Sequence, residues 1–315
     1  MDFEKCKLYK LKRKRDLFCK LRTTKKEVVL LLNKYKVCIN EDNRLLEKPC
    51  EALKKLQRKM LNQLYSIGFD DYVFSGIKGR SAQDNALYHL NSKYMLKLDM
   101  SKFFPNTHRN NVYEFFLEKL KMAPDVAAIC TDIVTVNYDN DRVIIEDNVF
   151  NYMKKKGIKI KNHLPSGTPT SQILSYLANI DLFNDIKSYC NLHKISCSIY
   201  VDDLTISTNR RISFKEEQEL KNIIKKHGHK ISKDKTIRYT EREYKKITGF
   251  VISPKGKLVL PNKMVLKLKK KMETVDREGK LPLNEKTSIL GIINFWRLSN
   301  IQAYRGLENA IRNEM

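Results

Sequence analysis

The chain is organised around the stretch Ile199-Tyr200-Val201-Asp202-Asp203-Leu204-Thr205-Ile206-Ser207. Apolar and β-branched residues flank two adjacent acids, a pattern that predicts a strand, a tight turn and a second strand with the acids at the bend. Two carboxylates at the tip of such a hairpin can face one cleft. Because the sequence contains 36 acidic residues, a solvated turn is the ordinary alternative.

Another acid in a similar setting favours a functional site. The alternating run Tyr94-Met95-Leu96-Lys97-Leu98 predicts a strand that ends at Asp99. Asp99, Asp202 and Asp203 would then converge at strand ends and form an oxygen-only site of the kind that magnesium prefers. Such a site suits phosphoryl transfer with two metal ions, in which one activates the attacking hydroxyl and the other stabilises the leaving pyrophosphate.

The order of the motifs resembles the palm of a reverse transcriptase, and the bacterial retron group in particular. The stronger motifs are Asp99, Leu164-Pro165-Ser166-Gly167-Thr168-Pro169-Thr170-Ser171 and Tyr200-Val201-Asp202-Asp203. Weaker ones are Asn85-Ala86-Leu87-Tyr88-His89, similar to the Asn-Ala-x-x-His signature of retron enzymes, and Ile247-Thr248-Gly249, similar to their Val-Thr-Gly motif.

This resemblance spans about residues 40 to 300 and implies an α+β right-hand polymerase, with fingers, a palm built on an antiparallel sheet and a helical thumb. Three domains are expected: 1–90 as a basic N-terminal extension and fingers, 91–255 as the palm with a fingers segment inserted at about 106–163, and 256–315 as the thumb. Segments rich in Lys and Leu predict thumb helices at 260–272, 287–298 and 304–312.

Catalytic roles follow from the same resemblance. Asp99 and Asp202 are expected to bind two Mg²⁺ ions, for which Mn²⁺ is a possible substitute. Met100 is expected to offer its backbone carbonyl to one ion, and Asp203 to act as a supporting ligand. The alternative is that these acids only cap turns.

The resemblance also implies a nucleotide site. Phe104 is expected to hold its ring against the sugar of the incoming nucleotide and to exclude a ribose 2′-hydroxyl. Phe103 is expected in the core, because one of two neighbouring strand residues must face inward. Arg44 is expected at the triphosphate, and Lys235 at the leaving pyrophosphate.

Ser166 and Gly167 complete the expected nucleotide site. The family usually has Gln where this chain has Ser166, and the shorter hydroxyl cannot reach as far towards the sugar or the primer end. Gly167 lets the backbone and the template come close.

The resemblance implies that the thumb and two further segments bind RNA, mostly through its shape and its phosphates. The two segments contribute Asn85 and His89 from one motif, and Ile247, Thr248 and Gly249 from the other. The alternative for the first motif is a capping Asn and a packed His.

Composition agrees with a nucleic-acid partner. The 315 residues carry a net charge of +25, and neutralising phosphates is the usual reason for so many Lys and Arg residues, although a basic structural protein could show the same charge. Seven cysteines without a C-x-x-C pattern predict reduced thiols in a bacterial cytoplasm. No apolar run approaches the roughly 20 residues of a membrane span, so no membrane partner is expected.

Two basic segments lie outside these motifs. Residues 5–26 predict a basic helix with one apolar face, which either contacts RNA or is simply solvated. Residues 142–148 and 157–160 predict short strands on either side of a basic turn at 154–156.

The leading functional hypothesis is a retron reverse transcriptase. Such an enzyme starts from a 2′-hydroxyl of a cognate structured noncoding RNA and polymerises dNTPs into single-stranded DNA linked to that RNA, in defence against phage with a separate effector protein. A second hypothesis is another defence-associated or group II intron-like reverse transcriptase. A third is an inactive RNA-binding scaffold with a polymerase fold.

Overall fold

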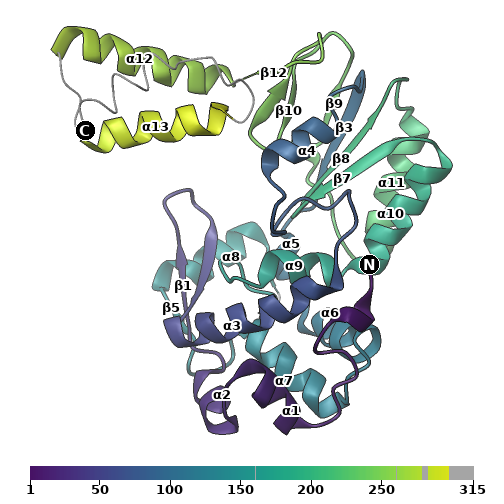
Figure 1. The fold of residues 1–315 in the computed structure, drawn as a ribbon, viewed down its shortest axis with the longest axis vertical. Coiled ribbons are helices and arrows are strands. Elements are labelled where there is room, and N and C mark those ends of the chain that lie inside the picture. The colour runs from purple at the N-terminus through teal and green to yellow at the C-terminus, as the bar shows by residue number, and fades with distance from the viewer. Residues whose placement is uncertain (160, 260, 279–282, 298–315) are drawn as a thin grey trace.

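The computed structural model describes residues 1–159, 161–259, 261–278 and 283–297 (Figure 1). The helices are α1 (Lys14–Leu21), α2 (Lys25–Leu31), α3 (Glu51–Leu64), α4 (Ala82–Tyr88), α5 (Phe103–Asn106), α6 (Arg109–Glu114), α7 (Pro124–Val134), α8 (Asp147–Lys156), α9 (Ser171–Leu177), α10 (Ile180–Leu192), α11 (Phe214–Lys226), α12 (Asn262–Glu278) and α13 (Leu283–Arg297). The strands are β1 (Tyr35–Ile39), β2 (Leu45–Pro49), β3 (Tyr94–Asp99), β4 (Val136–Asn137), β5 (Ile144–Ile145), β6 (Asn162–His163), β7 (Ser196–Tyr200), β8 (Asp203–Thr208), β9 (Ile237–Tyr239), β10 (Lys245–Ile247), β11 (Phe250–Ile252) and β12 (Leu258–Val259).

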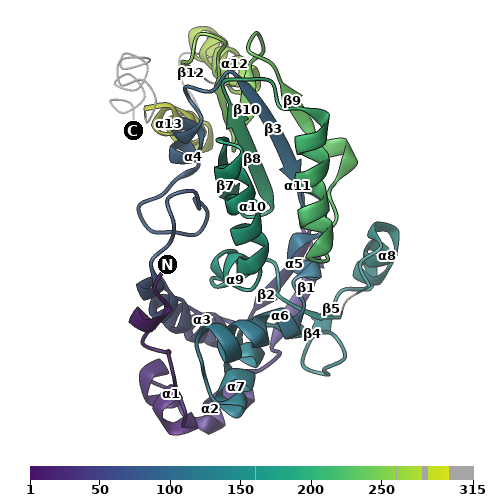
Figure 2. The same cartoon turned by 90° about the vertical axis from the view of Figure 1, so that its right-hand side faces the viewer.

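A four-stranded sheet in the order β7-β8-β3-β9 carries the two acidic motifs, and its adjacent strands are antiparallel. The predicted strand, turn and strand at 199–207 is confirmed as β7 and β8, and the predicted strand before Asp99 is β3. Helices α10 and α11 lie beside this sheet (Figure 2).

A second sheet, in the order β2-β1-β5, lies in the lower half of the molecule (Figure 1). Strands β1 and β2 form an antiparallel hairpin, and β5 pairs with β1 in parallel. The remaining strands form the β10-β11-β12 sheet, which contacts α4, and the β4-β6 pair.

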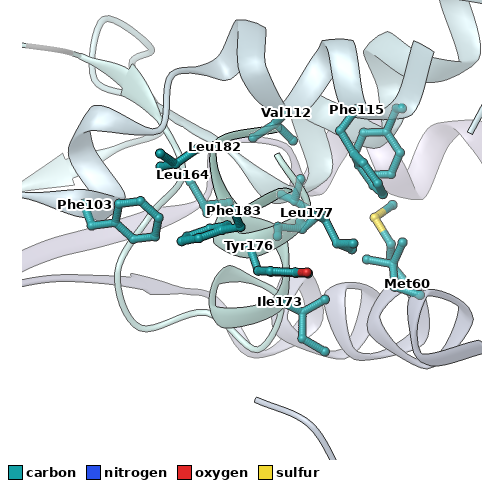
Figure 3. Close-up of a cluster of buried hydrophobic side chains, with 14 of the residues drawn as sticks. Met60, Phe103, Val112, Phe115, Leu164, Ile173, Tyr176, Leu177, Leu182 and Phe183 are labelled. Carbon is teal, nitrogen blue, oxygen red and sulfur yellow. The ribbon is translucent and has the colours of Figure 1, made fainter. Parts of the chain in front are cut away.

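The main core connects α3 with the segment that follows the β3 acid (Figure 3). Phe103 of α5 meets Phe183 of α10 edge to face with ring centroids 6.1 Å apart, and Phe183 stacks on Tyr176 of α9 at 5.1 Å. Burying such large rings supplies much of the hydrophobic stabilisation. The core therefore holds the chain in place directly after Asp99.

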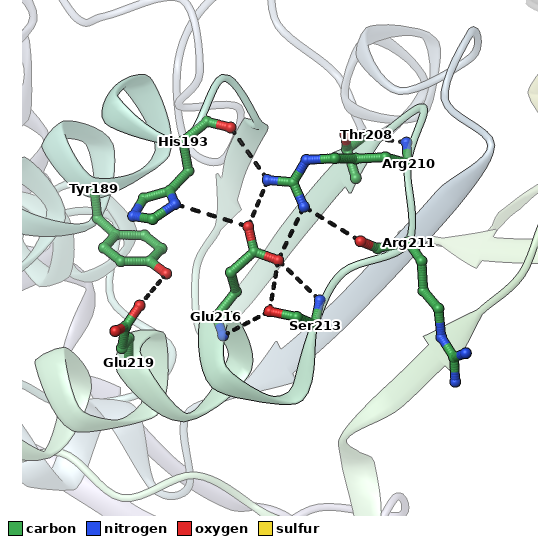
Figure 4. Close-up of polar contacts among 8 residues, drawn as sticks. All are labelled: Tyr189, His193, Thr208, Arg210, Arg211, Ser213, Glu216 and Glu219. Atoms are coloured by element: carbon green, nitrogen blue, oxygen red, sulfur yellow. Dashed lines mark hydrogen bonds and ion pairs between the residues drawn. The ribbon is translucent and has the colours of Figure 1, made fainter.

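The far end of the four-stranded sheet is tied to α11 by charged hydrogen bonds (Figure 4). Ser213 and Glu216 form a capping box at the start of α11. Arg210, just beyond β8, donates to both Glu216 carboxylate oxygens, at 3.0 and 2.5 Å. This ion pair lowers the pKa of Glu216 to about 2, with help from the Ser213 contacts.

Residues 5–26 do not form the single basic helix that the sequence predicts. Helix α1 ends at Leu21, and the next residue, Arg22, has a left-handed φ of 49°. Helix α2 begins at Lys25, directly after a capping box at Thr24. Leu8 and Leu11 are buried although they precede α1. The regular spacing of the leucines therefore arises because the segment before α1 is buried as well, and not because one long helix spans residues 5–26.

The basic turn predicted at 154–156 is wrong, and no strand forms at 157–159, the described part of the second predicted strand. Residues 154–156 form the last turn of α8, which buries Val149 and Met153 one turn apart and ends at Gly157 with a φ of 62°. Lysines in the last turn stabilise a helix, because its C-terminal end carries partial negative charge. Strand β5 does lie within the first predicted segment.

Helices α12 and α13 lie side by side beyond the β10-β11-β12 sheet (Figure 1) and agree with two of the three predicted thumb helices. The third, at 304–312, lies outside the described residues. Within the described ranges, no helix is long and apolar enough to cross a membrane. The proposed boundaries between fingers, palm and thumb stay a prediction.

Candidate active site

The strand register brings the acids together. Asp99 is the last residue of β3 and pairs with Asp203, the first residue of β8. The Met100 backbone N–H donates to the Asp202 carbonyl at 2.9 Å, which ties the end of β3 to the turn. Residues about a hundred positions apart in sequence thus meet at one edge of the sheet.

The turn itself is held in an uncommon conformation. Val201 has a φ of 59°, a region that β-branched residues rarely adopt. Its N–H donates to the Ser75 hydroxyl at 2.9 Å, so a residue from a distant loop supports the turn. Backbone strain of this kind persists only where surrounding contacts enforce it.

Negative charge is concentrated at this edge. Burial raises the pKa of Asp202 to about 6, and the charges of Asp99 and Asp203 add to the effect. Two lysines offset the charge: Lys235 Nζ lies 3.1 and 2.9 Å from the Asp99 carboxylate oxygens, and Lys97 Nζ lies 3.4 Å from Asp203 Oδ2. The carboxylates therefore attract a cation.

The donor set fits magnesium, which takes oxygen ligands and usually keeps one or two carboxylates together with waters and substrate phosphates. The described residues contain no group of three or more His, Cys, Asp or Glu side chains arranged to hold a metal ion. Such a group is not needed where the oxygens of the substrate phosphates supply the remaining ligands of the metal ion. The Lys235 ammonium forms an ion pair with the Asp99 carboxylate, which shows that this carboxylate can hold a cation.

The structure corrects the reason given for separating the two phenylalanines. Phe103 and Phe104 lie on helix α5 and not on a strand, so their side chains are offset around a helix axis. Phe103 is buried in the core, as expected, and Phe104 is partly buried. Contact between Phe104 and a nucleotide sugar stays a prediction.

The other expected nucleotide residues come from three places. Arg44 is exposed near the tip of the β1–β2 hairpin, and Lys235 bonds to Asp99. The Ser166 hydroxyl donates to the Leu45 carbonyl at 2.8 Å, so it faces the hairpin. Gly167 has a φ of 90°.

The structure does not support direct RNA contacts by the side chains of Asn85, His89 and Ile247, which are fully buried. His89 Nδ1 and Nε2 each lie 2.7 Å from a serine hydroxyl, of Ser207 and Ser198. Burial lowers the pKa of His89 to about 3, so the ring is neutral and supports α4 against the sheet.

The second motif also has a supporting role. The Thr248 hydroxyl donates to the Ala82 carbonyl at 2.8 Å, which links this turn to the start of α4. Thr248 and Gly249 have left-handed φ values of 44° and 91°. Whether they also contact RNA stays a prediction.

Sequence reasoning missed three residues of this region. Lys97 and Ser75 support the acids, as described above. Glu47 is fully buried beside Ser166 and belongs to no motif. The sequence of β2, Leu-Leu-Glu-Lys-Pro, does not alternate between apolar and polar residues, so no local signal marked Glu47 as inward-facing.

Carboxylates that meet at adjacent strand ends of an antiparallel sheet agree with the polymerase palm expected from the sequence. Residues 25–252 match the family described as "Reverse transcriptase (RNA-dependent DNA polymerase)". The match covers well over half of the chain, so the chain belongs to the reverse transcriptase family. Its fold is accordingly the right-hand polymerase fold, as predicted.

Curated relatives confirm the resemblance to retron enzymes. The retron Se72 reverse transcriptase of Salmonella heidelberg is 26% identical over 193 residues, which are 60% of this chain and 43% of that protein. The retron Ec83 reverse transcriptase of Escherichia coli is 26% identical over 264 residues, which are 80% of this chain and 77% of that protein. The match thus spans under half of one relative and about three quarters of the other.

Solved structures give more distant similarities. An apo telomerase from Candida tropicalis matches with a TM-score of 0.49 and 13% identity, over 73% of this chain and 55% of that one. A foamy viral protease-reverse transcriptase in complex with double-stranded DNA matches with a TM-score of 0.43 and 18% identity, over 83% of this chain and 35% of that one.

Proposed function

We propose that the chain is a retron reverse transcriptase, an RNA-directed DNA polymerase that copies part of a cognate structured noncoding RNA into single-stranded DNA linked to that RNA. The observation that carries the proposal is the meeting of Asp99, Asp202 and Asp203 at adjacent strand ends in a member of this family. An inactive scaffold would have no need to keep this concentration of charge.

In this proposal, Asp99 and Asp202 hold two Mg²⁺ ions, or Mn²⁺ in their place, with the Met100 carbonyl as a further oxygen ligand. Bound metal supplies a lowered hydroxyl pKa at the primer and charge neutralisation at the pyrophosphate. Asp203 keeps its contact with Lys97 and adds negative charge to the site. Lys235 moves from Asp99 to the phosphates, where its ammonium can donate a proton to the leaving group.

Three further elements contact the substrate in this proposal. Arg44 meets the triphosphate, Phe104 contacts the sugar, and the Ser166–Gly167 loop contacts the nucleotide. The template lies along the basic surface that the net charge of +25 provides. The domain division proposed from the sequence, with fingers to about residue 90, palm to 255 and thumb beyond, suits this arrangement.

We further propose that the protein works in the bacterial cytoplasm in defence against phage, together with a separate effector protein. The support is the similarity to proteins named as retron reverse transcriptases. Priming from a 2′-hydroxyl of the cognate RNA belongs to the same proposal.

The first test is expression of the chain with its flanking genomic DNA, beside an Asp202→Asn variant, followed by extraction and labelling of nucleic acid. We expect a discrete DNA joined to RNA that depends on Asp202. Ribonuclease treatment should shorten this product, and its sequence would identify the template.

A second arm uses purified protein, a generic primer–template and magnesium. If this extension succeeds but no RNA-linked DNA forms in cells, the polymerase stands and the retron assignment is wrong. If neither product forms while the protein is folded and binds RNA, the scaffold hypothesis replaces the proposal.

A further inference from the structure

Glu47 forms a buried connection between two parts of the expected nucleotide site. It lies on β2, three residues after Arg44, and its side chain is fully buried. Its Oε2 accepts from the Ser166 N–H at 2.6 Å and from the Ser166 hydroxyl at 3.1 Å. Its own N–H donates to the Ser166 carbonyl at 3.1 Å.

Other contacts close the same junction. The Ser166 hydroxyl also donates to the Leu45 carbonyl. At Gly167, an added Cβ would lie only 2.6 Å from Leu46 Cδ1. The hairpin and the loop are therefore packed without space for a side chain between them, and Glu47 supplies the polar part of the junction.

The second carboxylate oxygen of Glu47 faces two groups from the β4–β6 region. The Tyr138 hydroxyl donates to Oε1, and His163 Nε2 lies 3.4 Å from it. Burial, together with nearby His108, lowers the pKa of His163 to about 3, so this ring is neutral. Hydrogen bonds from neutral groups therefore satisfy the carboxylate.

This arrangement is costly for stability alone. Burial raises the pKa of Glu47 to about 7 although Tyr138 and Ser166 donate to it. A buried carboxylate that is held by neutral donors destabilises the fold relative to a well-packed apolar group. A buried carboxylate at this position therefore suits a role in the site better than a role in stability.

We propose that Glu47 is a positioning residue that holds the Ser166–Gly167 loop against the β1–β2 hairpin, so that the loop and Arg44 are set for the same incoming dNTP. The inference rests on the proposed polymerase function and names a specific element of its nucleotide site. Without the connection, both elements must be ordered when the nucleotide binds, which weakens binding.

The test is steady-state dNTP incorporation on a primer–template by the wild type, Glu47→Gln and Glu51→Gln. Glu51 provides the matched control, because the same change there affects an exposed carboxylate that forms an ion pair with Lys54. We expect Glu47→Gln to raise the KM for dNTP about tenfold with kcat within about threefold, because loss of positioning acts on binding. Glu51→Gln should match the wild type.

Ser166→Ala is a second variant in case Glu47→Gln does not fold. It removes the hydroxyl bonds but keeps the backbone N–H, so its KM should rise severalfold. If both changes are tolerated, the double variant should show less than the product of the single effects, because the two groups form one connection.

Three results overturn the inference. If the KM for dNTP is unchanged in both Glu47→Gln and Ser166→Ala, the inference is refuted while the polymerase proposal stands. The same holds if both variants lose kcat but keep the KM of the wild type. A wild type that incorporates no dNTP overturns the polymerase proposal, and the inference with it.

Discussion

At the residue scale, two carboxyl groups show how the surroundings of a side chain change its pKa. Asp202 lies partly buried beside two other carboxylates and has a raised pKa. Glu216 is also largely buried, but Arg210 lowers its pKa. Burial raises the first pKa with help from the neighbouring charges, whereas the hydrogen bonds from Arg210 outweigh burial in the second.

We expect Asp202→Asn to stabilise the metal-free protein. Because the folded-state pKa of about 6 lies above the ordinary value of 3.8, ionising Asp202 destabilises the fold as pH rises between these values. At pH 7.5 in EDTA, the variant should have a free energy of unfolding higher by about 2 kcal/mol. Urea denaturation measures this difference.

The same comparison at low pH provides the internal control. Below about pH 3 both states of the wild type are largely protonated at this site, so the advantage of the variant should disappear. Asp141→Asn, at an exposed position, should change little at either pH. An advantage that is equal at all pH values would contradict the electrostatic explanation.

At the element scale, hairpins and loops bring the functional groups together. The β7–β8 turn is supported by Ser75, and the β1–β2 hairpin by the Ser166–Gly167 loop. Each pair is distant in sequence. Local patterns therefore predicted the elements themselves but not which element supports which.

Gly167→Ala tests the junction of hairpin and loop. The substitution forces a non-glycine residue to a φ of 90° and brings its Cβ to 2.6 Å from Leu46 Cδ1, whose side chain must move. We expect a loss of about 2 kcal/mol in the free energy of unfolding and a clear rise in the KM for dNTP. Denaturation and incorporation assays measure the two effects.

Gly228→Ala is the matched control. Gly228 has a similar φ of 82°, but an added Cβ there meets nothing within 4 Å. It should show the backbone cost, on the order of 1 kcal/mol, without the effect on KM. Equal KM changes in both variants would mean that the contact with Leu46 is unimportant.

At the scale of the whole molecule, charge and fold act together. The sheet gathers negative charge at one edge, while the chain as a whole carries +25. A polyanion is thus attracted to the protein in general, and cations to the acidic edge in particular. This combination suits an enzyme that holds nucleic acid and metal ions simultaneously.

RNA binding should depend steeply on salt. Each phosphate that the protein neutralises releases a counterion, so the logarithm of affinity should fall linearly with the logarithm of salt concentration. We expect a loss of at least about a hundredfold in affinity between 50 and 200 mM salt. Filter binding or anisotropy measures the slope, and a flat response would contradict an electrostatic interface.

Asp202→Asn separates binding from catalysis in the same assay. It removes a charge at the acidic edge and leaves the basic residues intact. The variant should keep the salt slope of the wild type although it no longer extends a primer.

The sequence by itself determined the acidic strand ends, the sheet around them and the family resemblance, because strand alternation and short motifs are local properties of the chain. It also predicted the helices that the structure shows as α12 and α13, since segments rich in Lys and Leu favour helices. It failed at residues 5–26 and 154–156, where a left-handed residue and a helix end interrupt the apparent pattern.

Tertiary structure alone decided which groups meet. It buried His89 between two serines, placed Lys235 on Asp99 and joined Glu47 to Ser166 across more than a hundred residues. Such contacts arise from the packing of separate elements, and a polar side chain has no local signal that reveals its distant partner. The candidate site was therefore predictable in its acids but not in the residues that position them.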